Sequence, residues 1–215
     1  MLNSALEQRL TPLGYTRRSG TIFVRELSLG VLGTIGYLAA NKTSSIKLFV
    51  GVQFEHVEKL YDELSLPFRA IPAKSIPECF PTCFRDLSNL KQERSADPDF
   101  RLKESSYLRI STHAISGMCD QILVDLKQYG IPYIDFNATL GNAAATMAEM
   151  RGGGIGTTAY KLPIIYWILR RADEAMQYMT HIAAQKYPIG PYEKYAAMLA
   201  ARINAGPAPL SRKLH

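Results

Sequence analysis

The sequence is poor in residues that bind metals or form covalent cross-links. Its cysteines are Cys79, Cys83 and Cys119, an odd number that favours reduced thiols over a disulfide framework. Cys79 and Cys83 have the spacing of half a zinc site, but a structural zinc needs four ligands and no second pair has ligand spacing. We therefore expect no metal and no cofactor. The four histidines lie far apart, at His56, His113, His181 and His215.

Long apolar stretches are also missing. The longest run without a charged side chain, residues 27–41, contains three glycines and is shorter than the ~18 residues that a membrane-spanning helix needs. The first ten residues include Glu7, and no basic leader precedes an apolar segment, so they do not have the form of a signal peptide. We expect a cytoplasmic protein with no membrane partner.

Charge is present without being concentrated. The net charge is +6, charged residues make up 20% of the chain and apolar residues 47%, which is typical of a globular protein. No run of five like charges occurs, whereas a dedicated nucleic-acid-binding protein usually carries a basic patch or stripe. The charge pattern argues against nucleic acid as the partner and is compatible with an acidic one.

Three stretches near the start of the chain have the composition of consecutive antiparallel strands. Residues 21–27 and 46–54 alternate apolar and polar side chains, which predicts strands with one buried face. Residues 29–40 are apolar or small throughout, as in a central strand that is covered on both faces. A buried helix over residues 27–40 stays open as the alternative, because a short apolar run does not settle the period.

Apolar residues at helical spacing predict helices before and after these strands. Residues 2–13 form an amphipathic pattern, with Arg9 on the solvent side and Gly14 as its end. Gly130 and Pro132 should end the helix that precedes them, and Asp173 or its neighbour should cap a later one. The further helical patterns cover residues 57–64, 84–90, 115–129, 143–150, 163–170, 173–186 and 192–203.

Together these elements predict an α+β protein. An N-terminal helix packs on an antiparallel β-meander sheet, and a mainly helical C-terminal half follows. We expect the helix and sheet within residues 1–110, a helical region packed on them within residues 111–205, and a frayed tail at residues 206–215.

One glycine-rich segment has the spacing of a nucleotide-binding motif. Its glycines formally match a dinucleotide fingerprint, but that motif needs a strand before the glycines, and the residues before them look helical. We interpret the segment as a joint between two helices. The alternative is a nucleotide- or anion-binding sensor or enzyme that uses the backbone amides of residues 152–158. Its anion-binding residues would be Arg151, Gly152, Gly153, Gly154, Gly156 and Thr157.

Signatures of catalysis are absent. No Gly-x-Ser-x-Gly elbow occurs, and carboxylate pairs such as Asp62 and Glu63 are common on any protein surface. Ser111 and Thr112, which precede His113, suit the cap of a helix better than a catalytic group. We expect that the protein is not an enzyme.

Two segments carry a family resemblance. The first is a helix ending in LGY (residues 13–15), then two arginines and the strand TIFVR (residues 21–25); the second is LPIIYWIL (residues 162–169) followed by RADEA (residues 171–175). Together they resemble a bacterial group of helix-plus-meander domains, several of which are immunity proteins encoded beside polymorphic or contact-delivered toxins. The resemblance implies a cytosolic, non-enzymatic protein that neutralises a cognate toxin or effector by occluding it. Immunity proteins against nucleases are often acidic, so the basic charge argues against a nuclease target.

A partner surface is expected at the margins of the predicted sheet. An interface of standard size buries about 800 Å² on each partner and often has an arginine or aromatic side chain at its centre. The exposed, charged loop predicted at residues 91–104 is one candidate, and the arginines around the first strand are another. The candidate residues are Arg17, Arg18, Arg25, Asp97, Asp99 and Phe100.

Overall fold

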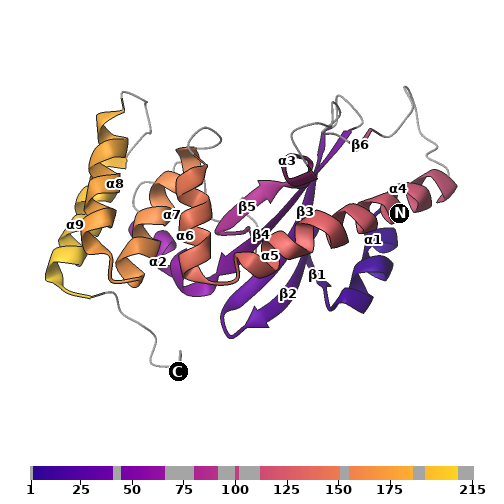
Figure 1. Ribbon diagram of the computed structural model, residues 1–215, viewed down its shortest axis with the longest axis horizontal. Helices are drawn as coiled ribbons and strands as arrows, with labels where there is room; N and C mark the ends of the chain where they lie inside the picture. Colours follow the sequence, from indigo (N-terminus) through magenta and orange to yellow (C-terminus); the bar gives the residue numbers. More distant parts are fainter. Residues whose placement is uncertain are drawn as a thin grey trace. The chain divides into compact units, whose positions relative to one another are not determined.

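The protein has the predicted α+β architecture, with an N-terminal helix, an antiparallel meander sheet and a mainly helical C-terminal half (Figure 1). The chain groups into two compact units, one formed by Met1–Gln53 with Glu78–Ala138 and the other by Phe54–Pro77 with Thr139–His215. The computed structural model describes residues 2–40, 45–65, 80–91, 100–101, 112–150, 155–185 and 192–207. None of the helices in these ranges has both the length and the apolar composition that a membrane span requires.

The first unit begins with helix α1 (Leu2–Leu10), which continues as a 3-10 turn, η1 (Thr11–Leu13). Leu6 and Leu10 are buried along the predicted apolar stripe. Gly14 ends the helix as predicted: its φ of 82° lies in the left-handed region that favours glycine, and its backbone N–H closes the last turn.

Five strands follow one another across the sheet in chain order, and a sixth short strand pairs with the fourth. The three predicted strands are confirmed. The helix alternative for residues 27–40 is wrong, because Val31 to Gly36 pair with the preceding strand in an antiparallel ladder. The strands are β1 (Thr16–Ser19), β2 (Ile22–Ser28), β3 (Val31–Ala40), β4 (Ser45–Phe54), β5 (Cys83–Asp86) and β6 (Phe100–Arg101).

Three strands lie where the sequence predicts other structure. β1 is missed because its four residues are all exposed and show no apolar alternation. The segment at residues 84–90 is only partly helical, since β5 pairs with β4 before helix α3 (Leu87–Lys91) begins. Phe100, predicted in an exposed loop, lies in β6 opposite Ile46 of β4.

A continuous helix crosses one face of the sheet (Figure 1). It is formed by α4 (Thr112–Asp125), a π-helical turn (Leu126–Gly130) and α5 (Ile131–Phe136). The prediction that Gly130 and Pro132 end this helix is wrong. Pro132 lies in the first two residues of α5, where its missing N–H is tolerated after the wider π turn. Gly130 is a packing position, since a Cβ there would be 3.1 Å from Cγ1 of Val50 in β4.

The two faces of the sheet have different neighbours. On one face, Gly33 of β3 lets α5 approach closely, because a Cβ there would be 2.8 Å from Cγ2 of Ile134. On the other face, the Phe49 ring lies across Gly36, and two further phenylalanine rings pack beside it at centroid distances of 5.6 and 6.2 Å. Residues 33–37 are thus buried on both faces, as predicted for a central strand.

The second unit is helical in all its described residues except short connections. The predicted helices are confirmed, but α7 begins at Ile155 and contains Pro163 instead of starting there. Pro163 cannot donate to the Ala159 carbonyl one turn earlier, and the Tyr192 hydroxyl donates to that carbonyl at 3.3 Å. The helices are α2 (Glu55–Ser65), α6 (Leu140–Glu149), α7 (Ile155–Ile168), α8 (Ala172–Ala184) and α9 (Tyr192–Ala205).

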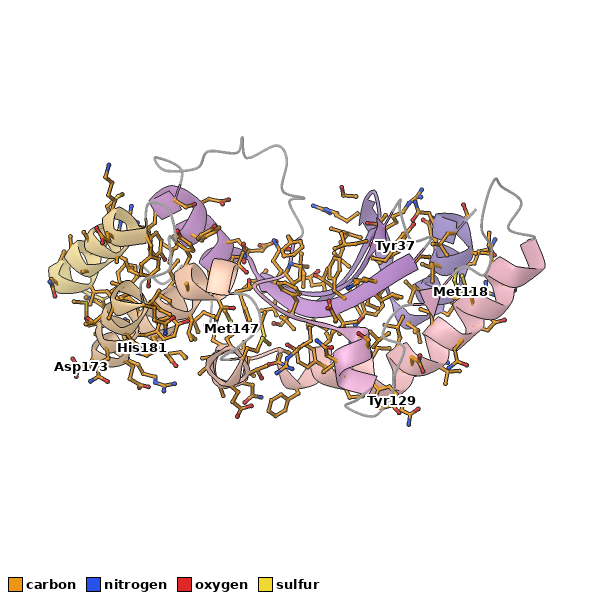
Figure 2. All side chains as sticks on the ribbon, turned by 90° about the horizontal axis from the view of Figure 1, so that it is seen from above. Tyr37, Met118, Tyr129, Met147, Asp173 and His181 are labelled. Atoms are coloured by element: carbon orange, nitrogen blue, oxygen red, sulfur yellow. The ribbon has the colours of Figure 1, made fainter. Side chains whose placement is uncertain are left out.

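The junction between α7 and α8 differs from the prediction in its cap. The N-cap of α8 is Arg171, whose side chain makes no capping bond, and Asp173 lies exposed in the first turn (Figure 2). Among the described residues other than glycine, Arg170 alone has a positive φ, 64°. This conformation reverses the chain, because the backbone N–H of Arg171 then reaches the Tyr166 carbonyl at 2.8 Å.

Candidate functional site: the arginine edge of the sheet

β1 forms one end of the sheet, and we call its residues Thr16–Ser19 the arginine edge. All four residues are exposed. Thr16 lies opposite Val24 and Arg17 opposite Phe23, and the register slips before Ser19, as in a β-bulge. Among the described strands only β2 pairs with β1, so β1 is an edge strand of the described sheet.

Arg17 and Arg18 give this edge its positive charge. Arg17 makes one long ion pair, from its Nε to Oε2 of Glu7 at 3.5 Å, and the two side chains are 41% and 40% exposed. A solvent-exposed pair of this kind contributes little to stability. Arg18 is exposed and makes no ion pair with any described residue. Both guanidinium groups are therefore accessible to an anionic partner.

The third predicted arginine, Arg25, is held inside the first unit. Its Nη2 donates to Oδ1 of Asp135 in α5 at 2.7 Å, and its guanidinium carbon lies 5.1 Å from the centre of the Tyr15 ring. The side chain is only 26% exposed. Burial raises the pKa of Tyr15 to about 12, although the charge of Arg25 opposes the shift, so this phenol is neutral at pH 7. We interpret Arg25 as a tie between the sheet and α5.

The other predicted partner-binding residues do not join the arginine edge. Phe100 lies in β6, which pairs with β4, and β4 is separated from β1 by two strands. Asp97 and Asp99 lie outside the described residues. Of the six candidates, the structure therefore brings together Arg17 and Arg18.

The glycine-rich segment is flanked by helices. α6 ends at Glu149 before it, and Gly156 and Thr157 lie in the first turn of α7 after it. A dinucleotide fingerprint needs a strand at the position that α6 occupies. The interpretation as a helix-to-helix joint agrees with these flanks, and the nucleotide or anion alternative stays a prediction. The residues Arg151, Gly152, Gly153 and Gly154 lie outside the described part of the chain.

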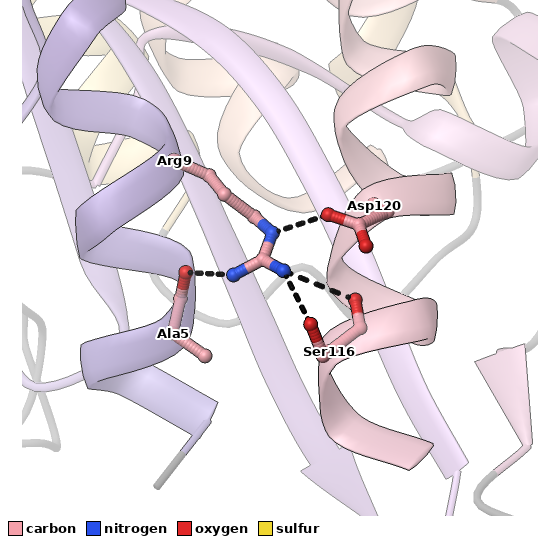
Figure 3. Close-up of polar contacts among 4 residues, drawn as sticks. All are labelled: Ala5, Arg9, Ser116 and Asp120. Atoms are coloured by element: carbon pink, nitrogen blue, oxygen red, sulfur yellow. Dashed lines mark hydrogen bonds and ion pairs between the residues drawn. The ribbon is translucent and has the colours of Figure 1, made fainter. Parts of the chain in front are cut away.

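A polar clasp around Arg9 joins α1 to α4 (Figure 3). Its Nε donates to Oδ1 of Asp120 at 2.7 Å, and its Nη2 donates to Oγ of Ser116 at 2.7 Å. The hydrogen bond raises the pKa of Arg9 and lowers that of Asp120. The prediction that Arg9 faces solvent is therefore wrong: its side chain is 19% exposed. The sequence does not reveal this, because Asp120 and Ser116 lie more than 100 residues further along the chain.

A second constellation that the sequence did not reveal lies in the second unit. Lys161 of α7 has a side chain that is 3% exposed, and its Nζ lies 2.7 Å from Oε2 of Glu58 in α2. The ammonium group also lies 5.3 Å from the centre of the Tyr61 ring. Tyr160 packs edge to face against Tyr195 at 4.7 Å between ring centres. A lysine inside an apolar helix signals a buried partner, but the sequence does not say which one.

The described cysteines are buried and unlinked. Burial raises the pKa of Cys83 to about 11, so its thiol is protonated at neutral pH and has little thiolate character. Its Sγ lies 3.3 Å from the Tyr133 hydroxyl. Cys79 lies outside the described residues. In the part of the chain that the structure describes, no three His, Cys, Asp or Glu residues form a group that could hold a metal ion.

Comparison of the chain with protein-family models, with curated proteins and with solved structures found no match.

Proposed function

We propose that the protein is an immunity-type protein that binds a cognate bacterial toxin or effector and neutralises it by occlusion. The observation that carries the proposal is the arginine edge, where Arg17 and Arg18 are exposed on a strand that pairs with β2 and with no other described strand. Arginine is enriched at the energetic centres of protein interfaces, and an exposed strand edge is a common docking position. Both features suit a binding protein.

The charge of the edge specifies the kind of surface that it would meet. Two adjacent guanidinium groups favour a carboxylate-rich surface on the partner through complementary potential. A nuclease presents a basic surface to its nucleic acid, and that surface would repel these arginines. The toxin that fits is therefore one whose working surface is acidic.

The test is to identify any toxin-bearing gene directly upstream of this one and to co-express its toxic region with the full chain. We expect growth to be rescued and a complex to form, with about tenfold weaker binding for the double variant Arg17→Glu with Arg18→Glu. The matched control, Lys127→Glu with Lys194→Glu, changes the net charge equally at exposed positions that are not part of β1 and should bind normally.

Two results would contradict the proposal. One is a neighbouring toxin that the chain neither binds nor neutralises. The other is a genome in which no toxin-bearing gene lies beside this one.

A further inference from the structure

We infer that the arginine edge captures an extended acidic segment of its partner as an additional antiparallel or parallel strand beside β1. The inference deepens the proposed function and rests on it, since it names how the partner would be held. Its basis is the backbone of Thr16–Ser19, which hydrogen-bonds β2 on one side and no other described strand. A strand added there would hydrogen-bond the outward N–H and C=O groups of β1, which pair with no described strand.

Side chains on the edge select an acidic segment. In a paired strand, residues directly opposite each other have Cβ atoms about 4.5–5.5 Å apart, so glutamate or aspartate on the added strand would lie beside Arg17 or Arg18. Opposite charges at that spacing are stabilising and like charges are destabilising. The exposed ion pair between Arg17 and Glu7, at 3.5 Å, is weak enough to be exchanged for a better-placed carboxylate.

The same features disfavour a second copy of this chain. Two β1 strands paired edge to edge would bring four arginines together, and like charges at cross-strand spacing are destabilising. Charged, short and bulged edges are the usual protection against indiscriminate strand pairing. On β1 both charged residues are positive, so they disfavour neutral and basic strands more strongly than acidic ones.

The experiment uses the full chain and a fluorescein-labelled eight-residue peptide that alternates glutamate and valine, followed by fluorescence anisotropy. We expect saturable binding that weakens about tenfold when alternate backbone amides of the peptide are N-methylated, because those amides can no longer pair. A lysine and valine peptide should not bind. For the double variant Arg17→Glu with Arg18→Glu the preference should invert, so that the lysine peptide binds and the glutamate peptide does not.

The inversion makes the test independent of folding, since an unfolded variant would bind neither peptide. Equal binding of the N-methylated peptide would overturn the inference, because the contact would then be made by side chains alone. No saturable binding at about 1 mM peptide, or a DNA oligonucleotide that displaces the peptide, would overturn it as well. A toxin that binds the chain with unchanged affinity after the double charge reversal would leave the proposed function standing and remove this inference.

Discussion

The hydroxyl of Thr34 is buried in β3, and its Oγ1 has no hydrogen-bond partner among the described residues. A buried hydroxyl without a partner keeps the penalty of its desolvation. Replacing Thr34 by valine should therefore raise the free energy of unfolding by about 1 kcal/mol, measured by urea denaturation. The exposed Thr16 on β1 provides the control, since Thr16→Val should change stability by less than about 0.5 kcal/mol. A destabilised Thr34→Val protein would show that the hydroxyl has a partner.

His56 in α2 makes stability depend on pH. Its Nε2 is buried without a partner among the described residues, and burial lowers its pKa below the ordinary 6.5. As the pH falls below 6.5, the unfolded chain takes up a proton that the folded chain does not, so the free energy of unfolding decreases. The decrease continues until the pH reaches the lowered pKa of the folded state.

The check is a series of urea denaturations between pH 7 and pH 5. The His56→Phe variant should lose this part of the pH dependence. The slope of stability against pH is compared with that of the wild type, so a general loss of stability in the variant does not obscure the result. An unchanged slope in His56→Phe would contradict the assignment.

At the scale of elements, the contact between β3 and α5 depends on Gly33. A methyl group there would be 2.8 Å from Ile134, so Gly33→Ala should lower the free energy of unfolding by about 1–3 kcal/mol through overpacking. Gly117 in α4 is exposed and a Cβ there meets nothing, so Gly117→Ala should raise it by up to about 1 kcal/mol through helix propensity. The two glycine-to-alanine substitutions should therefore change the free energy of unfolding in opposite directions. If Gly33→Ala left that free energy unchanged, α5 would be able to move away from β3.

The turn between α7 and α8 holds Arg170 in a conformation that suits glycine. A non-glycine residue in the left-handed region is strained by about 1–2 kcal/mol. Glycine relieves this strain, but part of the gain is offset because glycine loses more conformational entropy on folding. Arg170→Gly should therefore increase the unfolding free energy by up to about 1 kcal/mol in thermal or urea denaturation. Arg170→Ala, which keeps the strain, should change little, and equal effects of the two variants would rule out strain as the cause.

The elements that the sequence predicts are those whose apolar pattern is long enough to show a period. The strands at residues 21–27 and 46–54 and the helix at residues 2–13 are of this kind, and all three are confirmed. β1 has no buried residue to reveal it, although it supplies the candidate site. The helix through Gly130 and Pro132 escapes prediction because a π turn absorbs both residues that usually end a helix.

Contacts between distant segments explain why the site itself was only partly predicted. The three arginines near the first strands look alike in sequence, yet Arg25 is tied to Asp135, 110 residues away, while Arg17 and Arg18 stay exposed. Nothing in a single sequence links positions so far apart. Residue type and local pattern could identify the charged margin of the sheet, but not which of its arginines is accessible.

For the whole molecule, the modest charge and the distribution of accessible arginines agree on one kind of partner. A net charge of +6 does not concentrate into a nucleic-acid footprint, and Arg17 and Arg18 lie exposed on one strand edge. The partner that we propose is therefore an acidic protein that docks at β1. The proposed binding surface lies in the first unit, on four residues for which the sequence pattern predicts no helix or strand.

The most direct measurement is hydrogen exchange, detected by mass spectrometry, of the chain alone and in complex with the toxin that it is proposed to bind. We predict that the backbone amides of residues 16–19 exchange more slowly in the complex, because an added strand or covering surface protects them. Protection that appears elsewhere while residues 16–19 exchange as fast as in the free chain would contradict the arginine edge as the binding site.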